Sequence, residues 1–587
     1  MRRLLPLLAA CSLAFGAACS SSSGGAWKPG DPLTLDVSNT FPAGTALRDQ
    51  YSGKTASVGA NGSVTVTPDP RGVVLLERDG APPTPFTWQN ATVYFALTDR
   101  FFNGNPANDH SYGTRPADNN GEIGTWHGGD FAGLTQKLDY IAGLGATAIW
   151  ISPIVEQVHG WVSGGGGAWK HYAYAGYWAL DFTRLDQNFG SEAELQALVD
   201  GAHQRGLRVL VDVVMNHPGY ATGDDLLLYL PEVIDANGFR NFQPPAGRGY
   251  DAWNDLVNYK SPAWVNWWSP KWIRAGFPGF DPGGLDDLTS QLSFLPDFKT
   301  ESTAAADFPV LLQRRKSDTH AVADLNASVR QYLVKWHSDW VRKFGIDGFR
   351  CDTAKNVELG SWKALKAASA AALLDWKAAG AGASTKLDDA PFWMTGEVYG
   401  HGATKDAYFT DGGFDSLINF DFQNTLVTLL HDNPTLVAGA TGLEGLYSDL
   451  SAKISADPGF DTLSYLSSHD TDLFFGYVQY DAAKQRQAGT ALLLAPGSAQ
   501  IFYGDESGRQ RGNTQSDRVQ GTRSDMNWDT ADGSISDHWM KLAQFRKRHA
   551  AVGAGVHHQI VSPAGTYAFS RKLGTGDAVV VAITSGN

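Results

Sequence analysis

The sequence predicts an α/β fold: a closed (β/α)8 TIM barrel with an inserted domain after its third strand, a small N-terminal β-sandwich and a short C-terminal β-domain. Its 587 residues are enough for a barrel of typical size together with smaller domains. From Trp88 onward, short apolar runs alternate with amphipathic helical patterns, which is typical of β/α units around a parallel sheet. The stretch 218–317 breaks this alternation and is too long and irregular for an ordinary barrel loop. We therefore assign it to the inserted domain.

Residues 1–25 have the layout of an export signal followed by a flexible tether. Two arginines precede an apolar run from Leu4 to Ala18, which is too short to span a membrane comfortably. The run ends in Gly-Ala-Ala-Cys and is followed by serines and glycines, so it resembles a bacterial lipoprotein processing site with the lipid on Cys19. A cut at Cys11, or a plain secretory signal cut near Ala18, is the alternative. In each case we expect an exported protein of the periplasm or cell envelope.

The composition favours a neutral ligand. A formal net charge of -14 gives no electrostatic reason to expect nucleic acid or an anionic membrane surface as a partner. The 19 Trp, 20 Tyr and 29 Phe agree with this, because flat amphipathic rings stack on sugar faces. If Cys19 carries a lipid, only Cys351 remains, so we expect no internal disulfide and look for a bound metal instead.

Both ends of the chain are expected to form small β-domains. Residues 26–85 contain β-rich runs such as Ser63–Thr67 and Val73–Leu76 between Gly, Pro and Asn turns. Residues 541–587 contain the apolar run Ala578–Ile583. The N-terminal segment has no obvious aromatic platform for sugar, and the C-terminal segment is short. We expect both to cover the barrel and to take no part in catalysis.

The barrel is assigned to residues 86–217 and 318–540. A helix is expected over Leu134–Leu144, and another over Ser191–Arg205, where a capping box begins the helix and a glycine follows its end. The third strand is a nearly continuous apolar run, as expected of a parallel strand that is buried on both faces. The eight expected strands are Val93–Leu97, Ala148–Ile151, Val209–Val214, Gly348–Cys351, Phe392–Gly396, Leu417–Phe420, Ser464–Leu466 and Gln500–Tyr503.

Polar residues gather at the expected C-terminal ends of these strands, where a (β/α)8 barrel carries its chemistry. Taken singly, each acid has an ordinary explanation, because an Asp at a strand end often caps the following helix. Taken together and in barrel order, they indicate a single polar rim. The rim residues are Asp212, Asn216 and His217 at strand three, Arg350 and Asp352 at strand four, Glu397 at strand five, and His469 and Asp470 at strand seven.

Four segments resemble, in order and in spacing, the signature segments of the α-amylase family, glycoside hydrolase family 13. They are Asp-Val-Val-Met-Asn-His (Asp212–His217), Gly-Phe-Arg-Cys-Asp-Thr-Ala-Lys-Asn (Gly348–Asn356), Gly-Glu-Val (Gly396–Val398) and Ser-Ser-His-Asp (Ser467–Asp470). The likeness extends from about Trp88 to the C-terminus. The runs Asn108–Gly113 and Glu156–Val162 are similar to bacterial periplasmic α-amylases in particular.

The residue types suit retaining glycoside hydrolysis, which needs two carboxyl groups about 5 Å apart. Asp352 lies two residues after Arg350 on one strand, so they share a face and the guanidinium can hold the carboxylate ionised, as a nucleophile requires. Glu397 follows an apolar run, and a dry site beside other carboxylates would raise its pKa, as a general acid/base requires. By resemblance, Asp470 is the third carboxylate, which binds sugar hydroxyls and favours ring distortion.

The resemblance also implies the sugar contacts. His217 and His469 would hydrogen-bond the sugar in the subsite before the scissile bond, and Tyr177 would stack on the same ring. Asn356 stands where the family usually carries His, which changes the contact on the leaving-group side. The expected substrate-binding residues are Arg350, His217, His469, Tyr177, Trp178, Lys355 and Asn356.

Calcium is the cofactor that the resemblance implies, and its ligands are oxygen atoms of Asp, Asn and backbone carbonyls. One expected site, Asn216 and Asp297 with the backbone carbonyl of Asn356, would clamp the inserted domain onto the barrel. A second run resembles the N-terminal calcium loop of cyclodextrin glucanotransferases, although an Asn/Gly-rich turn explains it equally well. Its expected ligands are Asn103, Asn105, Asn108, Asp109, Gly128 and Asp130.

Three functions are compatible with these residues. The leading hypothesis is hydrolysis of α-1,4-glucosidic bonds in starch, maltodextrins or related α-glucans by a monomeric enzyme. The alternative is an α-glucan transglycosylase or cyclodextrin-processing enzyme, in which a sugar hydroxyl replaces water. A glucan-binding lipoprotein without catalysis is the third hypothesis, and it gives no reason to retain all three of Asp352, Glu397 and Asp470.

Overall fold

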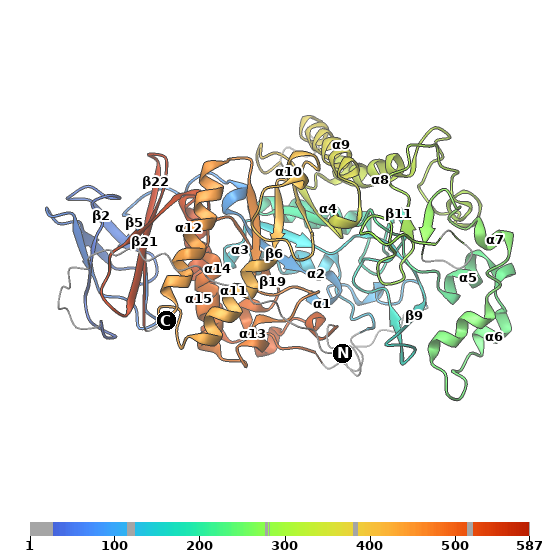
Figure 1. Ribbon diagram of the computed structural model, residues 1–587, viewed down its shortest axis with the longest axis horizontal. Coiled ribbons are helices and arrows are strands. Elements are labelled where there is room, and N and C mark those ends of the chain that lie inside the picture. The colour runs from blue at the N-terminus through green and yellow to red at the C-terminus, as the bar shows by residue number, and fades with distance from the viewer. Residues whose placement is uncertain are drawn as a thin grey trace.

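The structure is a computed structural model that describes residues 27–113, 124–275, 280, 282–379, 386–512 and 520–585. The expected signal, tether and lipid attachment at Cys19 lie outside the described residues. Figure 1 shows an elongated molecule, with a β-sheet built from both terminal segments at one end, the barrel in the middle and the small helices α5 (Gly223–Tyr229), α6 (Ala236–Arg240) and α7 (Pro262–Val265) at the other. Within the described part of the chain, every helix is too short or too polar to cross a membrane.

A closed barrel of eight parallel strands forms the centre, which confirms the predicted fold class. Around the barrel the strands run in the order β12-β15-β16-β17-β18-β19-β6-β7. Every residue of these strands is buried, so the apolar runs that predicted them are explained by burial on both faces. Their bounds are β6 (Thr92–Ala96), β7 (Ala148–Ile151), β12 (Arg208–Val213), β15 (Gly348–Cys351), β16 (Trp393–Gly396), β17 (Ser416–Asn419), β18 (Asp461–Tyr465) and β19 (Ser498–Phe502).

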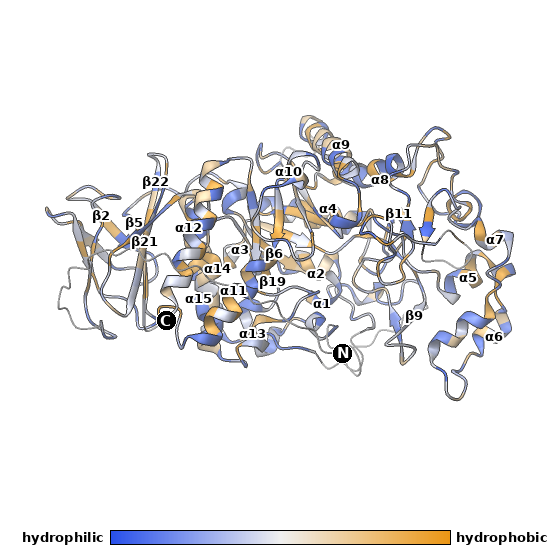
Figure 2. Cartoon of the chain, viewed as in Figure 1, coloured by the Kyte–Doolittle hydropathy of each residue, from blue (hydrophilic) through white to orange (hydrophobic). Residues whose placement is uncertain are grey.

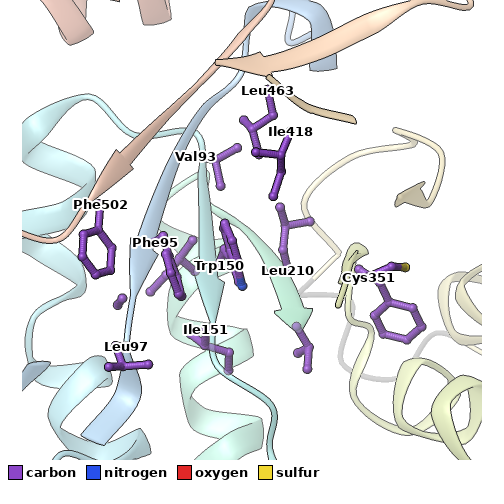
Figure 3. Packing of buried hydrophobic residues seen from close by; sticks show 14 of the residues in the cluster. Val93, Phe95, Leu97, Trp150, Ile151, Leu210, Cys351, Ile418, Leu463 and Phe502 are labelled. Atoms are coloured by element: carbon purple, nitrogen blue, oxygen red, sulfur yellow. The ribbon is translucent and has the colours of Figure 1, made fainter. Parts of the chain in front are cut away.

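Large side chains fill the barrel core. Phe95 of β6 and Trp150 of β7 are partners in the strand register, and their rings stack with centroids 3.8 Å apart and planes 11° apart. Figure 3 shows this pair beside Leu210, with Ile418 and Leu463 nearer the other end of the core. The core is therefore packed, and the chemistry is confined to the rim.

The outer layer consists of amphipathic helices, which show mixed colours around the hydrophobic barrel strands in Figure 2. The expected capping box is present, because the Ser191 side chain accepts a hydrogen bond from the Glu194 N–H and Glu194 reciprocates. The helix expected over Leu134–Leu144 is two helices that meet at Lys137. The helices are α1 (Thr98–Phe101), α2 (Phe131–Gln136), α3 (Leu138–Leu144), α4 (Glu192–Gln204), α8 (Val329–Phe344), α9 (Leu359–Ala378), α10 (Ala407–Thr410), α11 (Phe420–Asp432), α12 (Ala440–Ala456), α13 (Phe474–Tyr477), α14 (Ala482–Leu493), α15 (Gly533–Arg548) and α16 (Ala551–Ala554).

The segment between β12 and α8 holds α5 to α7 and a short pair of strands. Its tryptophans form a core, since Trp253, Trp264, Trp267, Trp268 and Trp272 are each at most 3% exposed. Trp272 stacks on Trp336 of α8, with centroids 5.6 Å apart, and so fastens the segment to the barrel. The boundaries 218–317 of the inserted domain stay a prediction. The small strands here and in the loop after β7 are β8 (Val155–Gln157), β9 (Trp161–Gly164), β10 (Trp169–Tyr172), β11 (Ala179–Leu185), β13 (Ile273–Ala275) and β14 (Asp297–Phe298).

The two terminal segments form one antiparallel sheet together. The sequence predicted a separate β-domain at each end. Its six strands run in the order β20-β21-β22-β5-β2-β3, and a separate pair, β1 and β4, lies against it. One face of the central strands, including Val73 and Val581, joins the barrel core, while the other, including Val74 and Val580, joins a second core under β1. The bounds are β1 (Leu33–Asp36), β2 (Ala46–Asp49), β3 (Thr55–Ser57), β4 (Ser63–Val66), β5 (Val73–Arg78), β20 (Val556–Ile560), β21 (Thr566–Leu573) and β22 (Asp577–Thr584).

A buried ion cluster joins this sheet to the end of α15. The His549 imidazole contacts Asp577 of β22 through Nδ1 at 2.8 Å and Glu77 of β5 through Nε2. Arg548 also contacts Glu77, at 2.9 Å. Burial raises the pKa of Glu77, but hydrogen bonds from His549 and Arg548 outweigh it and bring this pKa to about 2. Burial lowers the pKa of His549, and its two carboxylate partners raise it above its ordinary value.

We expect Glu77→Gln to lower the free energy of unfolding by about 3 kcal/mol, because it removes the buried carboxylate that His549 and Arg548 share. The Glu77 contribution is complete above its ordinary pKa of 4.5 and fades as pH falls toward 2. The His549 contribution is complete below 6.5 and fades as pH rises through its raised pKa. Chemical denaturation across pH should therefore show the largest difference from wild type between pH 4.5 and 6.5.

The matched control is Asp79→Asn, which breaks the partly exposed Arg48–Asp79 pair in the same sheet. It should change stability by less than about 1 kcal/mol at every pH. Equal losses in the two variants, or a Glu77→Gln loss that does not vary with pH, would contradict the assignment.

Candidate active site

A cavity of about 750 Å³ opens at the C-terminal ends of the barrel strands. Asp352 follows β15, Glu397 follows β16, and Asp470 lies in the loop after β18. Among the residues predicted for catalysis and substrate binding, Arg350 alone lies beneath the cavity wall, although it contacts residues that form the wall. The predicted residues that line the cavity are Asp352, Glu397, Asp470, His217, His469, Tyr177, Trp178, Lys355 and Asn356.

The Arg350 guanidinium gathers carboxylates from three adjacent strands. Its Nη1 is 2.9 Å from Asp352 Oδ1 and 3.0 Å from both carboxylate oxygens of Asp212, and its Nη2 is 3.0 Å from Glu397 Oε2. The side chain is 1% exposed, and its Cζ lies 5.2 Å from the centroid of the Trp150 ring. Because Asp352 and Glu397 contact the two terminal nitrogens of one planar group, their carboxylates lie side by side.

A strained turn holds the acidic pair in place. Thr353, directly after Asp352, has φ of 45°, a left-handed conformation that is uncommon for a β-branched residue. In this conformation the Thr353 N–H donates to Glu397 Oε2 at 3.0 Å, and the next N–H, of Ala354, donates to the Glu397 carbonyl at 2.7 Å. Such strain persists only where surrounding contacts maintain it, and it often marks functional sites.

The three carboxyl groups have different electrostatic surroundings. Burial raises the pKa of Glu397 to about 7, with the charges of Asp352 and Asp470 adding to burial and that of Arg350 opposing it. Burial also raises the pKa of Asp352, and Arg350 opposes that shift as well. The pKa of Asp470 is lowered, because His469 and Arg523 outweigh the effect of its burial. Near neutral pH, Glu397 can therefore exchange a proton while Asp470 stays ionised.

Aromatic and imidazole side chains line the wall beside these acids. The rings of Tyr177 and His469 stack with centroids 5.2 Å apart, and the Tyr177 hydroxyl donates to Asp212 at 2.7 Å. Burial lowers the pKa of His217 to about 4, so its imidazole is neutral at pH 7. Its Nε2 is buried and has no hydrogen-bond partner among the described residues, which leaves it available to a ligand.

Other parts of the cavity wall connect to the segment between β12 and α8. Lys355 is 3.2 Å from Asp287, and the Asn356 amide donates to the Asp287 carbonyl at 2.7 Å. Trp178 packs edge-on against Tyr220, with centroids 5.0 Å apart. Both walls are thus built on contacts between the barrel and the loops inserted in it.

Several lining residues were missed by sequence reasoning. Arg523 and Gln520 approach from the loop after β19, which carries no signature segment. Tyr399, which is 67% exposed, lines the cavity near Glu397. Its position shortly after the fifth strand is the signal in the sequence that indicates it. His171 lies on the β9–β10 hairpin, where no pattern separates it from an ordinary strand residue.

Only some of the oxygen atoms in the first expected calcium site are available to bind a metal ion. The backbone brings two members together, since the Phe298 N–H next to Asp297 donates to the Asn216 carbonyl at 2.9 Å. Asp297 Oδ2 is already paired with Arg274 Nε at 2.7 Å, whereas its Oδ1 is buried without a hydrogen bond from any described residue. Burial raises the pKa of Asp297 to about 6. Here Arg274 supplies positive charge where a calcium ion was expected.

The second expected calcium set fits a metal better. Asn103 donates to both oxygens of Asp109, at 3.1 and 3.0 Å, while its own Oδ1 is buried and unpaired within the described structure. Asn108 Oδ1 is likewise buried without a hydrogen bond from any described residue. So is Asn188 Oδ1, and the Asn188 amide donates to the Asp109 carbonyl at 3.3 Å. Amide oxygens beside a carboxylate are ligands that suit calcium. Asn188 was not predicted, because it comes from the loop before α4.

The remaining members of that set have other roles. Asp130 accepts from the Gly133 N–H at 2.6 Å, caps α2, and also binds the N–H groups of Gly104 and Asn105. The Asn105 amide donates to Glu194 at 3.1 Å. Gly128 has φ of 92°, and a Cβ there would lie 2.4 Å from the Asn103 amide nitrogen, so only glycine fits. Three His, Cys, Asp or Glu side chains do not come together as a metal site anywhere in the described residues.

Two neighbouring carboxyl groups at the C-terminal rim of a (β/α)8 barrel suit glycoside hydrolysis. The family model "Alpha amylase, catalytic domain" matches residues 95–224 and 316–552. The chain belongs to the α-amylase family and is an α-amylase-type glycoside hydrolase.

Relatives extend this finding. The chain is 48% identical to the periplasmic α-amylase of Escherichia coli over 570 residues, which cover 94% of this chain and 81% of that protein. It is 28% identical to an α-amylase of Streptomyces lividans over 79% of this chain and 51% of that protein. A solved α-amylase of Geobacillus thermoleovorans, complexed with acarbose, has the same fold, with a TM-score of 0.55 and 23% identity over 84% of this chain and 86% of the other.

We expect Arg350→Met to lower the free energy of unfolding by about 3 to 5 kcal/mol, because it leaves three buried carboxylates without their cation. The pKa values of these groups would then rise further in the folded protein, so the loss should be larger at pH 8 than at pH 5. Chemical denaturation at both pH values measures it. Arg342→Met, which removes two surface ion pairs made by α8, should change stability by less than about 1 kcal/mol. A pH-independent loss for Arg350→Met would show that lost packing explains the effect.

Proposed function

We propose that the chain hydrolyses α-1,4-glucosidic bonds in starch, maltodextrins or related α-glucans, with retention of anomeric configuration. The observation that carries this proposal is the pair Asp352 and Glu397, which contact the two terminal nitrogens of Arg350. Retaining hydrolysis requires two carboxyl groups that are close together and differ in protonation. The likeness to the periplasmic α-amylase of Escherichia coli supports the same assignment.

In this proposal, an Asp352 oxygen attacks the anomeric carbon while Glu397 gives its proton to the departing glycosidic oxygen. The bond from the anomeric carbon to that oxygen breaks, and a glycosyl ester on Asp352 forms. Glu397, now a carboxylate, takes a proton from water, whose oxygen attacks the same carbon and releases Asp352. The raised pKa of Glu397, about 7, suits a group that both gives and takes a proton.

The other lining residues would hold the sugar. Asp470, His217 and His469 are assigned to its hydroxyl groups, and Tyr177 to its ring face. Arg350 acts from below through the carboxylates. The remaining proposed contacts come from Trp178, Lys355 and Asn356.

The proposed setting is the periplasm or cell envelope, with a lipid on Cys19 and the protein as a monomer. The relative from Escherichia coli is named as periplasmic, which supports export. A transglycosylase is the second candidate, because the chain is also 27% identical to a cyclomaltodextrin glucanotransferase of Bacillus sp. (strain 1011) over 83% of its length. The chain covers 58% of that protein.

The test is product analysis after incubation of wild type and Glu397→Gln with soluble starch and with maltoheptaose. We expect short α-anomeric maltooligosaccharides from wild type, and a loss of about 100-fold or more in the variant, which cannot donate the proton. Chromatography of the products, with NMR of the newly formed anomer, measures both.

Products longer than the substrate would favour the transglycosylase. Binding of maltoheptaose without any product would favour a binding protein and would overturn the catalytic assignments. β-Anomeric first products would overturn retention.

We also propose a calcium site formed by Asn103, Asn108, Asp109 and Asn188, where a bound ion would cross-link the loop after α1 to the loop before α4. Calcium at one hundred times its Kd should raise the free energy of unfolding by about 2.7 kcal/mol, and chelator should reverse this. Asn188→Ala and Asp109→Asn should reduce or abolish the calcium-dependent rise in Tm. Asn424→Ala, an exposed change on α11, should retain it. A full rise in both loop variants would place the ion elsewhere.

A further inference from the structure

Among the three acids of the cleft, Asp470 is the one that the barrel strands hold in place least directly. Its side chain is 36% exposed, compared with 9% for Asp352 and 11% for Glu397. Its own N–H donates to the Ser468 hydroxyl at 3.2 Å, within the same loop. Arg350, which holds the other two acids, makes no ion pair with Asp470 in the described structure. The orientation of Asp470 must therefore be maintained by other groups.

Two groups contact the carboxylate. His469 Nε2 lies 2.9 Å from Asp470 Oδ2, and Arg523 Nη2 donates to Asp470 Oδ1 at 2.6 Å. Burial lowers the pKa of His469, so its imidazole is mainly neutral near pH 7 and acts as a hydrogen-bond donor. Among the described residues, Arg523 is then the permanent cation in contact with Asp470.

Arg523 is itself held firmly. Its side chain is 11% exposed, and its Nη1 donates to Gln520 Oε1, which also accepts from the Tyr174 hydroxyl. The Arg100 guanidinium lies 3.9 Å from the centroid of the Tyr174 ring. A chain of contacts therefore fixes the guanidinium before any substrate binds.

The backbone beside Arg523 reaches the same loop. The Thr522 hydroxyl donates to the His469 carbonyl at 2.8 Å. Arg509 donates to the Thr522 carbonyl at 2.9 Å and so connects this turn to β19. The turn Gln520–Arg523 thus contacts both residues of the His469–Asp470 pair, through the backbone of one and the side chain of the other.

We propose that Arg523 is a positioning residue, which aims the Asp470 carboxylate into the cleft and keeps it ionised while Glu397 carries the proton. This inference rests on the proposed function. The charged and titratable groups that face Asp470 include Asp352, Glu397, Arg350, His469, Arg523 and Tyr177. Asp352, Glu397 and Asp470 share this space, and among the described residues Arg350 and Arg523 are the permanent cations that pair with them. Without Arg523, a proton could move from Glu397 to Asp470, where it would serve no purpose in the reaction.

The pKa of Asp470 agrees with this geometry. Burial raises it, but His469 and Arg523 lower it below the ordinary value for Asp. Removing a cation that is in contact with an acid raises the pKa of that acid by about 1 to 3 units. Removing the Arg523 cation from the shared cleft disfavours the charged form of each nearby carboxylate, so the acidic limb of the pH profile, which reports the carboxylates that must be charged, should move to higher pH.

The test compares the pH profiles of kcat and kcat/KM on maltoheptaose for wild type, Arg523→Gln, Arg523→Lys and Arg511→Gln. Arg511 is the matched control, because it pairs with Asp472 in the same pair of loops. We expect Arg523→Gln to lower kcat about tenfold to 100-fold and to move the acidic limb upward by about one pH unit. Arg523→Lys keeps the charge, so it should keep the acidic limb near its wild-type position. Arg511→Gln should match wild type.

The outcomes are separable. An Arg523→Gln variant with an unshifted acidic limb overturns the inference, whatever its kcat, because a purely structural role lowers activity without changing protonation. A limb that shifts equally in Arg523→Lys also overturns it, because charge is then not responsible. If wild type proves as inactive as Glu397→Gln, the proposed function fails and the inference falls with it. If Arg523→Gln does not fold, Arg523→Ala, which also removes the charge, takes its place and is judged by the same shift of the acidic limb.

Discussion

The buried guanidinium of Arg350 is the constraint on which the rest of the site depends. Asp212, Asp352 and Glu397 come from three adjacent strands, and each carries a charge that burial opposes. One planar cation with two terminal nitrogens can contact all three side chains, whether or not each is ionised, only if β12, β15 and β16 keep their register. Arg350 pairs with Asp212 on one side and with Thr395 on the other, so the barrel supplies that register directly. The strand register that closes the barrel is therefore the same register that places the three acids.

The site beyond Arg350 is assembled from loops. The left-handed Thr353 points its N–H at Glu397, and the turn after β19 supplies Arg523 to Asp470. The result is an unequal distribution of protons among three close acids, because one acid gains its own cation while another shares Arg350 and loses solvent. Differences in protonation of this kind arise from position, since Asp and Glu have nearly the same pKa in water.

The sequence predicted the barrel well because each strand is a short apolar run with a polar residue just beyond its end. The strand β18 was placed less accurately, since it begins at Asp461, a buried acid that accepts from the Ser498 N–H and looks like a loop residue in the sequence. The cleft acids could be predicted because they lie next to strands. Arg523 and Asn188 could not, because each reaches its partner from a distant loop without local periodicity. For the same reason, the pairing of β5 with β22 left no signal in either segment alone.

The pairing of β5 with β22 has a consequence for the order of folding. Leu76 lies opposite Val580, so nearly the whole chain separates two strands that must meet. Contacts of such long sequence separation form late, because loop closure opposes them until the intervening barrel has condensed. Until then, the apolar strand β5 is paired with β2 on one side only, and its bare edge can pair with another copy of the chain. Truncation near β22 would therefore affect solubility before it affected the cleft.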